Sequence, residues 1–297
     1  MLREHGPILI PLDGSQLAEG ALPYAVALAK AFEERIALLS VWEGNETELA
    51  AALPAVAIEL EARAREHFAT YLSTLQARSF GGVPVEALIR EGDAETEIAS
   101  TAAELHARAI VIATHGRSGI GRWFYGSTAA GLLRTSTVPV MAVGPHALAS
   151  PPADVTLRHI MCPLDGAPLA EAALAVASSI AERTGAKLSL VRVVNWAAQS
   201  YPYTLPDAYI PQLDDELEAS ANAYLKRKVS DASVETSAFV VRGAVAESLI
   251  DFVSNQAVDL VVMTTHGRAG FARAALGSTA DRMLQAAAPV LLIRPAD

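Results

Sequence analysis

Two loops of the chain combine glycines with a hydroxyl residue at identical spacing, a combination that suits phosphate binding. In the first loop, nine residues separate Gly116 from Gly126, and Ser127 follows at once. In the second loop, nine residues separate Gly267 from Gly277 in the same way. Because glycine lacks a Cβ, it lets the backbone take positive φ angles and approach a ligand closely. The spacing therefore indicates a pair of anion-binding loops.

The residues after the second glycine of the first loop are suited to begin a helix. Ser127 or Thr128 is a good N-cap, and the free N–H groups of a helix N-terminus favour an anion. Arg117 and Arg268 could add a charge-assisted contact. The simpler alternative is an ordinary glycine-bearing turn before a capped helix. Recurrence of the same spacing after the same strand favours the phosphate site.

Two further residue types recur beside these loops. Asp13 and Asp165 each follow a short apolar run, where an aspartate either closes a turn or contacts a ligand; their recurrence favours the ligand role. His115 and His266 could bond a ligand, but we favour a role in ordering the loop. No second histidine, cysteine or carboxylate stands at metal-ligand spacing, so we expect no metal site in the chain itself.

The chain repeats itself along its whole length. The segment 8–14 (ILIPLDG) matches 160–166 (IMCPLDG), 152 residues later. The glycine loops match at an offset of 151, and 138–140 matches 288–290 at an offset of 150. Near-constant offsets over half the chain indicate a duplicated domain rather than a short solenoid repeat. We predict domains at 1–146 and 158–297, joined by a linker.

The hydrophobic pattern of one copy alternates between strand and helix. Expected strands are 8–12, 36–41, 85–89, 109–113 and 138–143; expected helices are 17–32, 55–75, 95–106 and 128–135. Such alternation predicts two tandem α/β domains, each a doubly wound, five-stranded parallel sheet of Rossmann-like type. Ligands of these sheets bind beyond the carboxyl ends of the strands, which is where Asp13, Val41 and the glycine loop are expected.

These motifs resemble those of the universal stress protein family, and the resemblance covers essentially the whole chain, twice. The family's ATP-binding pattern is Gly, two residues, Gly, nine residues, Gly, then Ser or Thr. The resemblance implies that Asp13 and Asp165 contact the nucleoside and that Val41 and Val193 lie near the adenine. This chain departs from the pattern at its first glycine, which is Ala113 in one copy and Thr264 in the other.

The predicted nucleotide-binding residues are therefore drawn from both copies. In the first copy they are Pro11, Leu12, Asp13, Val41, Ala113, His115, Gly116, Arg117, Gly119, Gly126, Ser127 and Thr128. In the second they are Pro163, Leu164, Asp165, Val193, Thr264, His266, Gly267, Arg268, Gly270, Gly277, Ser278 and Thr279. Ala intrudes little at the first position and Thr more, so the copies could have diverged, with the first binding and the second serving as scaffold.

The function implied is that of an adenine-nucleotide-binding stress-response or regulatory protein without efficient catalysis. ATP is the expected ligand, with AMP or ADP as variants, and Mg²⁺ could accompany it. A slow ATP hydrolase is one alternative. The other is an interaction or scaffold protein that binds no nucleotide, because Ala113 and Thr264 have closed the sites.

The amino-acid composition limits the kinds of partner and the cellular location that we expect for the protein. A net charge of −10 over 297 residues repels phosphate backbones, so nucleic acid is an unexpected partner. No apolar stretch approaches the ~20 residues that span a bilayer, and the lone Cys162 cannot form an intrachain disulfide; a cytoplasmic protein is expected. In the resembling family the last strand pairs with that of another domain. We therefore expect antiparallel edge-strand pairing between the two domains, and further association of whole chains as a homodimer.

Overall fold

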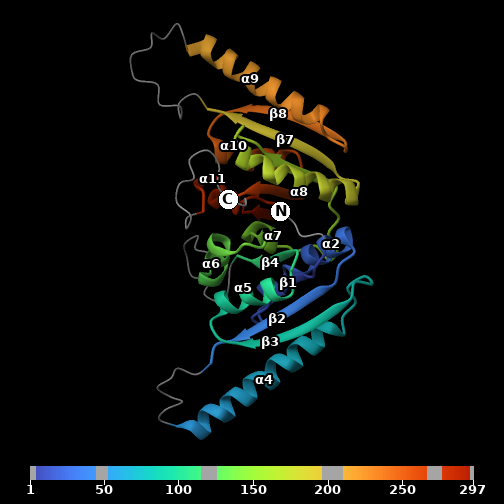
Figure 1. Cartoon of the computed structure of the whole chain (residues 1–297), viewed down its shortest axis with the longest axis vertical. Helices are drawn as coiled ribbons and strands as arrows, with labels where there is room; N and C mark the ends of the chain where they lie inside the picture. Colours follow the sequence, from blue (N-terminus) through green and yellow to red (C-terminus); the bar gives the residue numbers. More distant parts are fainter. Residues whose placement is uncertain (1–4, 45–52, 115–125, 196–209, 266–275, 295–297) are drawn as a thin grey trace. The chain divides into compact units, whose positions relative to one another are not determined.

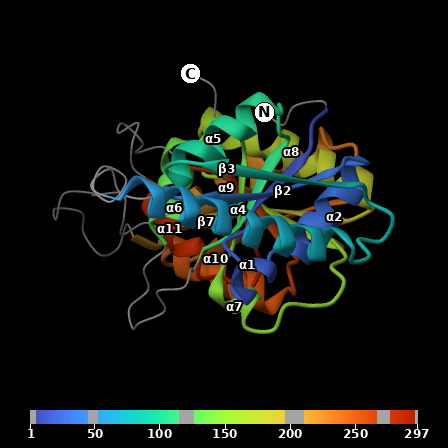
Figure 2. The same cartoon turned by 90° about the horizontal axis from the view of Figure 1, so that it is seen from below.

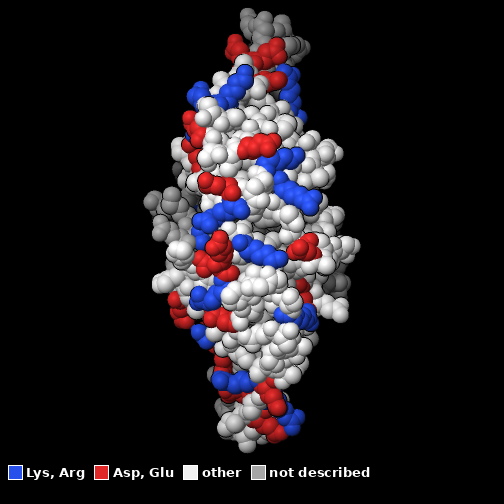
Figure 3. Space-filling view, turned by 90° about the vertical axis from the view of Figure 1, so that its right-hand side faces the viewer, with Lys and Arg blue, Asp and Glu red and all other residues white. Residues whose placement is uncertain are grey.

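The computed structural model describes residues 5–44, 53–114, 126–195, 210–265 and 276–294, with the backbone alone for 210–214. The chain divides into two compact units, a first at residues 2–155 and a second at 156–297. Among the described helices, none is both long and apolar enough to cross a bilayer. Acidic and basic side chains are interspersed on the face seen in Figure 3.

The first unit is a parallel sheet with helices on both faces (Figure 1). Its sheet order is β3-β2-β1-β4-β5, and α5 lies on the opposite side of β2 and β3 from α2 (Figure 2). The strands are β1 (Ile8–Pro11), β2 (Ile36–Trp42), β3 (Val85–Glu91), β4 (Ala109–Ala113) and β5 (Val140–Val143). The helices are α1 (Gln16–Glu19), α2 (Leu22–Phe32), α4 (Pro54–Gln76), α5 (Ala94–Glu104), α6 (Ser127–Thr135) and α7 (Pro145–Leu148).

The second unit repeats this topology, with sheet order β8-β7-β6-β9-β10. Its strands also pair in parallel, so the predicted class of two tandem Rossmann-like α/β units is confirmed. The strands are β6 (His159–Pro163), β7 (Lys187–Val194), β8 (Thr236–Arg242), β9 (Leu260–Thr264) and β10 (Val290–Ile293). The helices are α8 (Pro168–Thr184), α9 (Ile210–Ser230), α10 (Val245–Asn255) and α11 (Ser278–Met283).

The central strand of each unit is sealed on both faces. Ile8, Leu9 and Ile10 of β1 are completely buried, as expected for a strand of a parallel sheet covered by helices on both sides. In β6 the position of Ile10 is held by Cys162, which is also completely buried. Burial raises the pKa of the Cys162 thiol to about 12. The thiol therefore stays protonated and acts as a small apolar core residue.

One predicted helix, 17–32, proves to be two. Helix α1 is capped by the Ser15 hydroxyl, which accepts the N–H of Ala18, and it ends at Gly20. A Cβ on Gly20 would come within 2.8 Å of a Leu148 methyl carbon of α7, so the chain turns where two segments approach closely. Pro23 then falls in the first turn of α2, where the missing N–H costs nothing.

Candidate functional site

A cavity of about 260 Å³ opens in the first unit at the carboxyl ends of the central strands. Its walls come from the end of β1 and the turn into α1, from β2 and β4, and from the first turns of α5 and α6. The sheet order places β1 between β2 and β4, so chain connections leave β1 and β4 in opposite directions and open a crevice there. The lining residues are Pro11, Leu12, Asp13, Ala18, Leu39, Val41, Ala94, Ile98, Ile112, Ala113, Gly126, Ser127, Thr128 and Ala129.

The structure brings together every described residue that the sequence assigned to the first site. The eight are Pro11, Leu12, Asp13, Val41, Ala113, Gly126, Ser127 and Thr128. The other four, His115, Gly116, Arg117 and Gly119, lie outside the described residues. Sequence reasoning missed the apolar remainder of the wall. Strand alternation could have found Leu39, two residues before Val41, but no local signal marks Ala94 or Ile98 of α5.

Both strand-end aspartates close a turn. Asp13 Oδ1 accepts the N–H of Ser15 at 2.9 Å, and Asp165 Oδ1 accepts that of Ala167 at 2.8 Å. The glycine between donor and acceptor has φ of +80° at Gly14 and +87° at Gly166, a conformation that other residues rarely take. The turn interpretation is thus correct for both residues. It leaves Asp13 exposed at the mouth of the cavity, where its negative charge can meet a ligand.

Side chains of β2 alternate between the cavity and the opposite face of the sheet. Leu39 and Val41 line the cavity. The intervening Ser40 is completely buried, and its hydroxyl donates to the carbonyl of Leu12 at 2.9 Å. This hydrogen bond holds the backbone of Leu12, the residue directly before Asp13. The apolar wall and the carboxylate are therefore positioned by the same pair of strands.

The start of α6 differs from the sequence prediction. Gly126, not Ser127 or Thr128, is the N-cap, with φ −55° and ψ 146°, and no side chain caps the helix. Ser127 and Thr128 are instead its first two residues and line the cavity. Because Gly126 has no side chain to accept from the first N–H groups, these groups remain suited to an incoming anion. The interpretation as a phosphate-binding helix end survives, but the capping role does not.

A backbone hydrogen bond closes the base of each glycine loop. The N–H of Gly126 donates to the carbonyl of Thr114 at 3.1 Å, and that of Gly277 donates to Thr265 at 2.9 Å. Thr114 and Thr265 are themselves held to the last strand of their sheets, through the carbonyls of Val143 and Ile293. In each unit, the residue before the loop and the residue after it are therefore held together. The predicted loop residues of the second unit, His266, Gly267, Arg268 and Gly270, lie outside the described residues.

The second unit carries its predicted residues at equivalent strand ends, but with different local chemistry. Pro163 ends β6, and Leu164 and Asp165 follow it; Val193 lies near the end of β7, and Gly277, Ser278 and Thr279 form the start of α11. Thr264, in place of Ala113, is buried at 6% exposure. Helix α11 has only six residues. The N-cap of helix α10 is Ala244, which provides no side-chain cap.

In the first unit, by contrast, α5 is firmly capped beside the cavity. Asp93 Oδ1 accepts both the N–H and the hydroxyl of Thr96, at 2.9 and 2.7 Å. The hydrogen bond from the Thr96 hydroxyl, and after it the one from the Thr96 N–H, hold the pKa of Asp93 below its ordinary value. The cap fixes Ala94, which follows directly and lines the cavity. The first unit thus has the better-built wall.

A half-buried tyrosine and a basic residue lie beside a glutamate in both units, on the side of the long helix. In the second unit Tyr224 donates to Glu171 Oε1 at 3.0 Å, and Lys228 lies 2.8 Å from Glu171 Oε2. The counterparts are Tyr71, Glu19 and Arg78. Arg78 Nη1 lies 2.7 Å from Glu19 Oε2; the Tyr71 hydroxyl is buried near the same carboxylate but forms no hydrogen bond of good geometry. The offsets between the copies are nearly equal, 152 residues for the glutamates and 153 for the tyrosines, and could have revealed this cluster from the sequence.

The cluster ties the long helix to the wall of the cavity. Glu19 follows Ala18, which lines the cavity, while Tyr71 and Arg78 lie in and just after α4. Burial first, and then the charge of Glu19, raise the pKa of Tyr71. Burial and the bond to Glu171 do the same for Tyr224. Both hydroxyls therefore stay protonated and able to donate at neutral pH.

The two tyrosines should respond oppositely to loss of the hydroxyl. Tyr224→Phe removes a hydrogen bond to a carboxylate and should destabilise the second unit by about 1–2 kcal/mol. Tyr71→Phe removes an unsatisfied buried hydroxyl and should leave the first unit unchanged or up to ~1 kcal/mol more stable. Amide hydrogen exchange in β1 and β6 reports the two units separately. Equal losses in both variants would contradict this interpretation of the cluster.

Comparison with known proteins points to one family. The model of the universal stress protein family matches residues 5–144 and again 156–294. A universal stress protein of Mycolicibacterium smegmatis is 28% identical over an alignment of 307 positions, gaps included, which covers 98% of both chains. One of Mycobacterium tuberculosis is 29% identical over 192 residues, covering 63% of this chain and 62% of its own. Two domains of one family thus account for nearly the whole chain.

Solved structures show the same fold. The crystal structure of a universal stress protein from Archaeoglobus fulgidus superposes with a TM-score of 0.65 at 17% identity, covering 98% of both chains. A structure from Pseudomonas aeruginosa described as a putative universal stress protein gives a TM-score of 0.63 at 17% identity, covering 98% of this chain and 94% of its own. At these identities the likeness concerns the fold alone.

Proposed function

The chain belongs to the universal stress protein family, and from this premise we propose that its first unit binds an adenine nucleotide in the cavity at the ends of β1 and β4. ATP is the leading ligand, with ADP and AMP as variants. Binding would serve regulation in a stress response rather than rapid turnover. One observation carries the proposal: eight residues chosen from sequence motifs line a single cavity at the switch point of the sheet.

The lining has the chemistry that a nucleotide requires. Leu39, Val41, Ile98 and Ile112 form an apolar wall suited to a purine ring. Asp13 at the mouth can accept hydrogen bonds from ribose hydroxyls or an exocyclic amine, and the uncapped start of α6 can meet a phosphate. About 260 Å³ is near the lower end of ligand pockets. That size suits the base and ribose, with phosphates directed outward along α6.

The lining also supports binding over catalysis. Asp13 is the one ionisable side chain among the described lining residues, so they offer no paired acid and base. Mg²⁺ fits as a companion of the phosphates, since it usually keeps several waters and few protein ligands. Asp13 or Ser127 could hold those waters. Slow hydrolysis remains the alternative, and a catalytic role of Asp13 would support it.

We propose a divided role for the two units. Thr264 buries a β-branched side chain where the first unit has Ala113, α10 lacks the cap that Asp93 gives α5, and α11 is short. These three differences favour nucleotide binding in the first unit and a scaffold role for the second. The alternative function, a scaffold that binds no nucleotide, is thus proposed for the second unit and not for the whole chain.

Reciprocal exchange of Ala113 and Thr264 tests this division. Isothermal titration of the nucleotide-stripped full chain with ATP and Mg²⁺ should give one strong site per chain. Ala113→Thr should weaken that site by about 10–100-fold, since a branched side chain costs ~1–3 kcal/mol in a closed cavity. Thr264→Ala should leave it unchanged. Loss of the strong site in Thr264→Ala but not in Ala113→Thr would place the nucleotide in the second unit.

Substitution of the aspartate by asparagine separates its turn from its ligand contact. Asp13→Asn keeps an Oδ1 acceptor for Ser15 and removes the negative charge. We expect unchanged thermal stability and roughly tenfold weaker ATP binding, with Asp165→Asn as the matched control that binds normally. ATP turnover measured in parallel decides the enzyme question. Turnover above background that disappears in Asp13→Asn would establish slow hydrolysis.

A further inference from the structure

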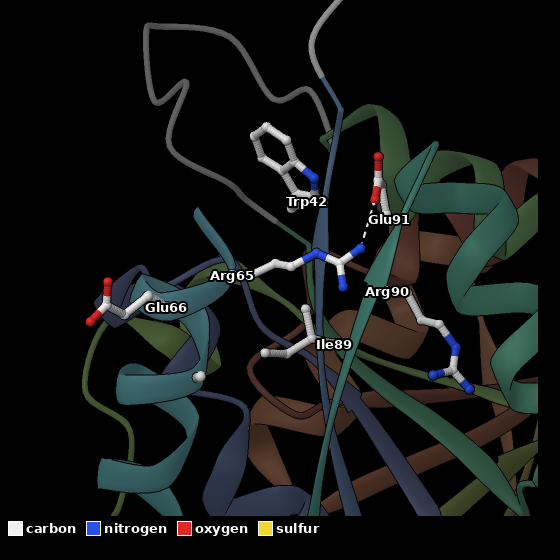
Figure 4. Close-up of a pocket in the computed structure, with 7 residues that line it drawn as sticks. Trp42, Arg65, Glu66, Ile89, Arg90 and Glu91 are labelled. Atoms are coloured by element: carbon white, nitrogen blue, oxygen red, sulfur yellow. Dashed lines mark hydrogen bonds and ion pairs between the residues drawn. The ribbon is translucent and has the colours of Figure 1, made fainter. Parts of the chain in front are cut away.

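A second cavity, of about 330 Å³, lies on the opposite face of β2 from the proposed nucleotide site. Strand alternation separates the two: Val41 faces the first cavity and Trp42 faces the second. Helix α4 forms its outer wall, and the strand ends of β2 and β3 form its inner wall (Figure 4). The described lining residues are Trp42, Arg65, Glu66, Ala69, Ile89, Arg90 and Glu91.

Trp42, which lines the cavity, carries a hydrogen-bond donor with nothing to bond. The indole Nε1 of Trp42 is buried and has no partner. An N–H sealed from water without an acceptor is costly, and most buried polar groups are satisfied. The indole ring, Ala69 and Ile89 otherwise make the walls apolar. A molecule that brought an acceptor to this N–H would offset the cost and cover the apolar walls.

The four charged side chains among the described lining residues, Arg65, Glu66, Arg90 and Glu91, sum to zero formal charge. Arg65 reaches from α4 to Glu91 at the end of β3, with Nη2 3.0 Å from Oε2, and also pairs with Glu61 at 3.1 Å. In Figure 4, Glu66 points away from the group, and Arg90 points across β3, where it pairs with Glu104 at 3.4 Å. The pair that faces the cavity is neutral as a whole, which favours an uncharged ligand. Both partners are half-exposed, so parting them costs little.

The second unit keeps the ion pair and lacks the donor. Its counterparts of Arg65 and Glu91 are Glu218 and Arg242, whose Nε lies 2.7 Å from the carboxylate. The pair is thus conserved in position with its charges exchanged, as a structural tether between helix and strand would be. Val194 stands in the place of Trp42. The indole is therefore a feature of the first unit, and the ion pair between helix and strand forms without it in the second.

We propose that this cavity binds a small, uncharged, flat aromatic molecule that carries an acceptor at the edge of its ring. The ring packs against the indole, Ala69 and Ile89. The acceptor takes the N–H of Trp42, and the Arg65 side chain moves aside to admit it. The site is separate from the nucleotide cavity, since the two have no lining residue in common within the described part of the chain.

Quinoline and naphthalene are matched probes, because they share a shape and only quinoline has a ring-nitrogen acceptor. The full chain labelled with ¹⁵N-tryptophan gives indole N–H signals for its three tryptophans, and the signal missing in Trp42→Phe identifies Trp42. Quinoline should move this signal downfield in a saturable way, and naphthalene should not. Trp42→Phe keeps a ring but no donor and should bind quinoline at least ~10-fold more weakly.

Three results would overturn the proposal. One is a Trp42 signal that does not move with quinoline. Another is equal affinity for quinoline and naphthalene, or for Trp42→Phe and the unaltered chain. The third is displacement of quinoline by ATP with no change at Trp42, which would place the probe in the nucleotide cavity. ATP titration of Trp42→Phe should be normal, so failure here is distinct from failure of nucleotide binding.

Discussion

Burial of the parallel sheet on both faces is the constraint on which the rest of each unit depends. With helices covering both sides, strands such as β1 are wholly apolar and offer no chemistry along their length. Chemistry is therefore confined to the edge where the strands end. Because the order β3-β2-β1-β4-β5 reverses direction between β1 and β4, that edge opens at one place. Asp13, Val41 and the start of α6 meet there for this reason.

The parts of the site that follow from local patterns could be predicted from the sequence. Strand ends, the aspartate turn and the glycine before α6 each carry a signal within a few residues. Repetition made those signals stronger, since a turn that recurs at the same strand end is harder to attribute to chance. The predicted N-cap of α6 was wrong. The sequence Gly126-Ser127-Thr128 is compatible with an N-cap at the glycine or at the next residue, and the structure places it at Gly126.

What the sequence could not give depends on contacts between distant segments. Ala94 and Ile98 line the cavity only because α5 crosses behind β2. Gly20, at the end of α1, has no room for a Cβ because Leu148, more than a hundred residues away, lies against it. The tyrosine of α4 and the glutamate of α1 are likewise brought together by the fold. Such residues carry no local pattern, and only comparison of the two copies would have marked the last pair.

The two units share a scaffold and differ in what the scaffold carries. The turn, the loop closure and the helix-to-strand ion pair occur in both, even where charges are exchanged. Ala113, the Asp93 cap and Trp42 occur in the first unit alone. Duplication allows this, because two copies of one scaffold can diverge at positions that the core does not require.

The most direct test of this account is to locate the nucleotide by methyl NMR of the full chain titrated with ATP and Mg²⁺. The account predicts saturable shifts of the methyl groups of Leu39, Val41, Ile98 and Ile112, which line the first cavity. The methyl groups of Val193 should remain in place. Shifts at Val193 without shifts at Val41, or none in either unit at saturating ATP, would contradict it.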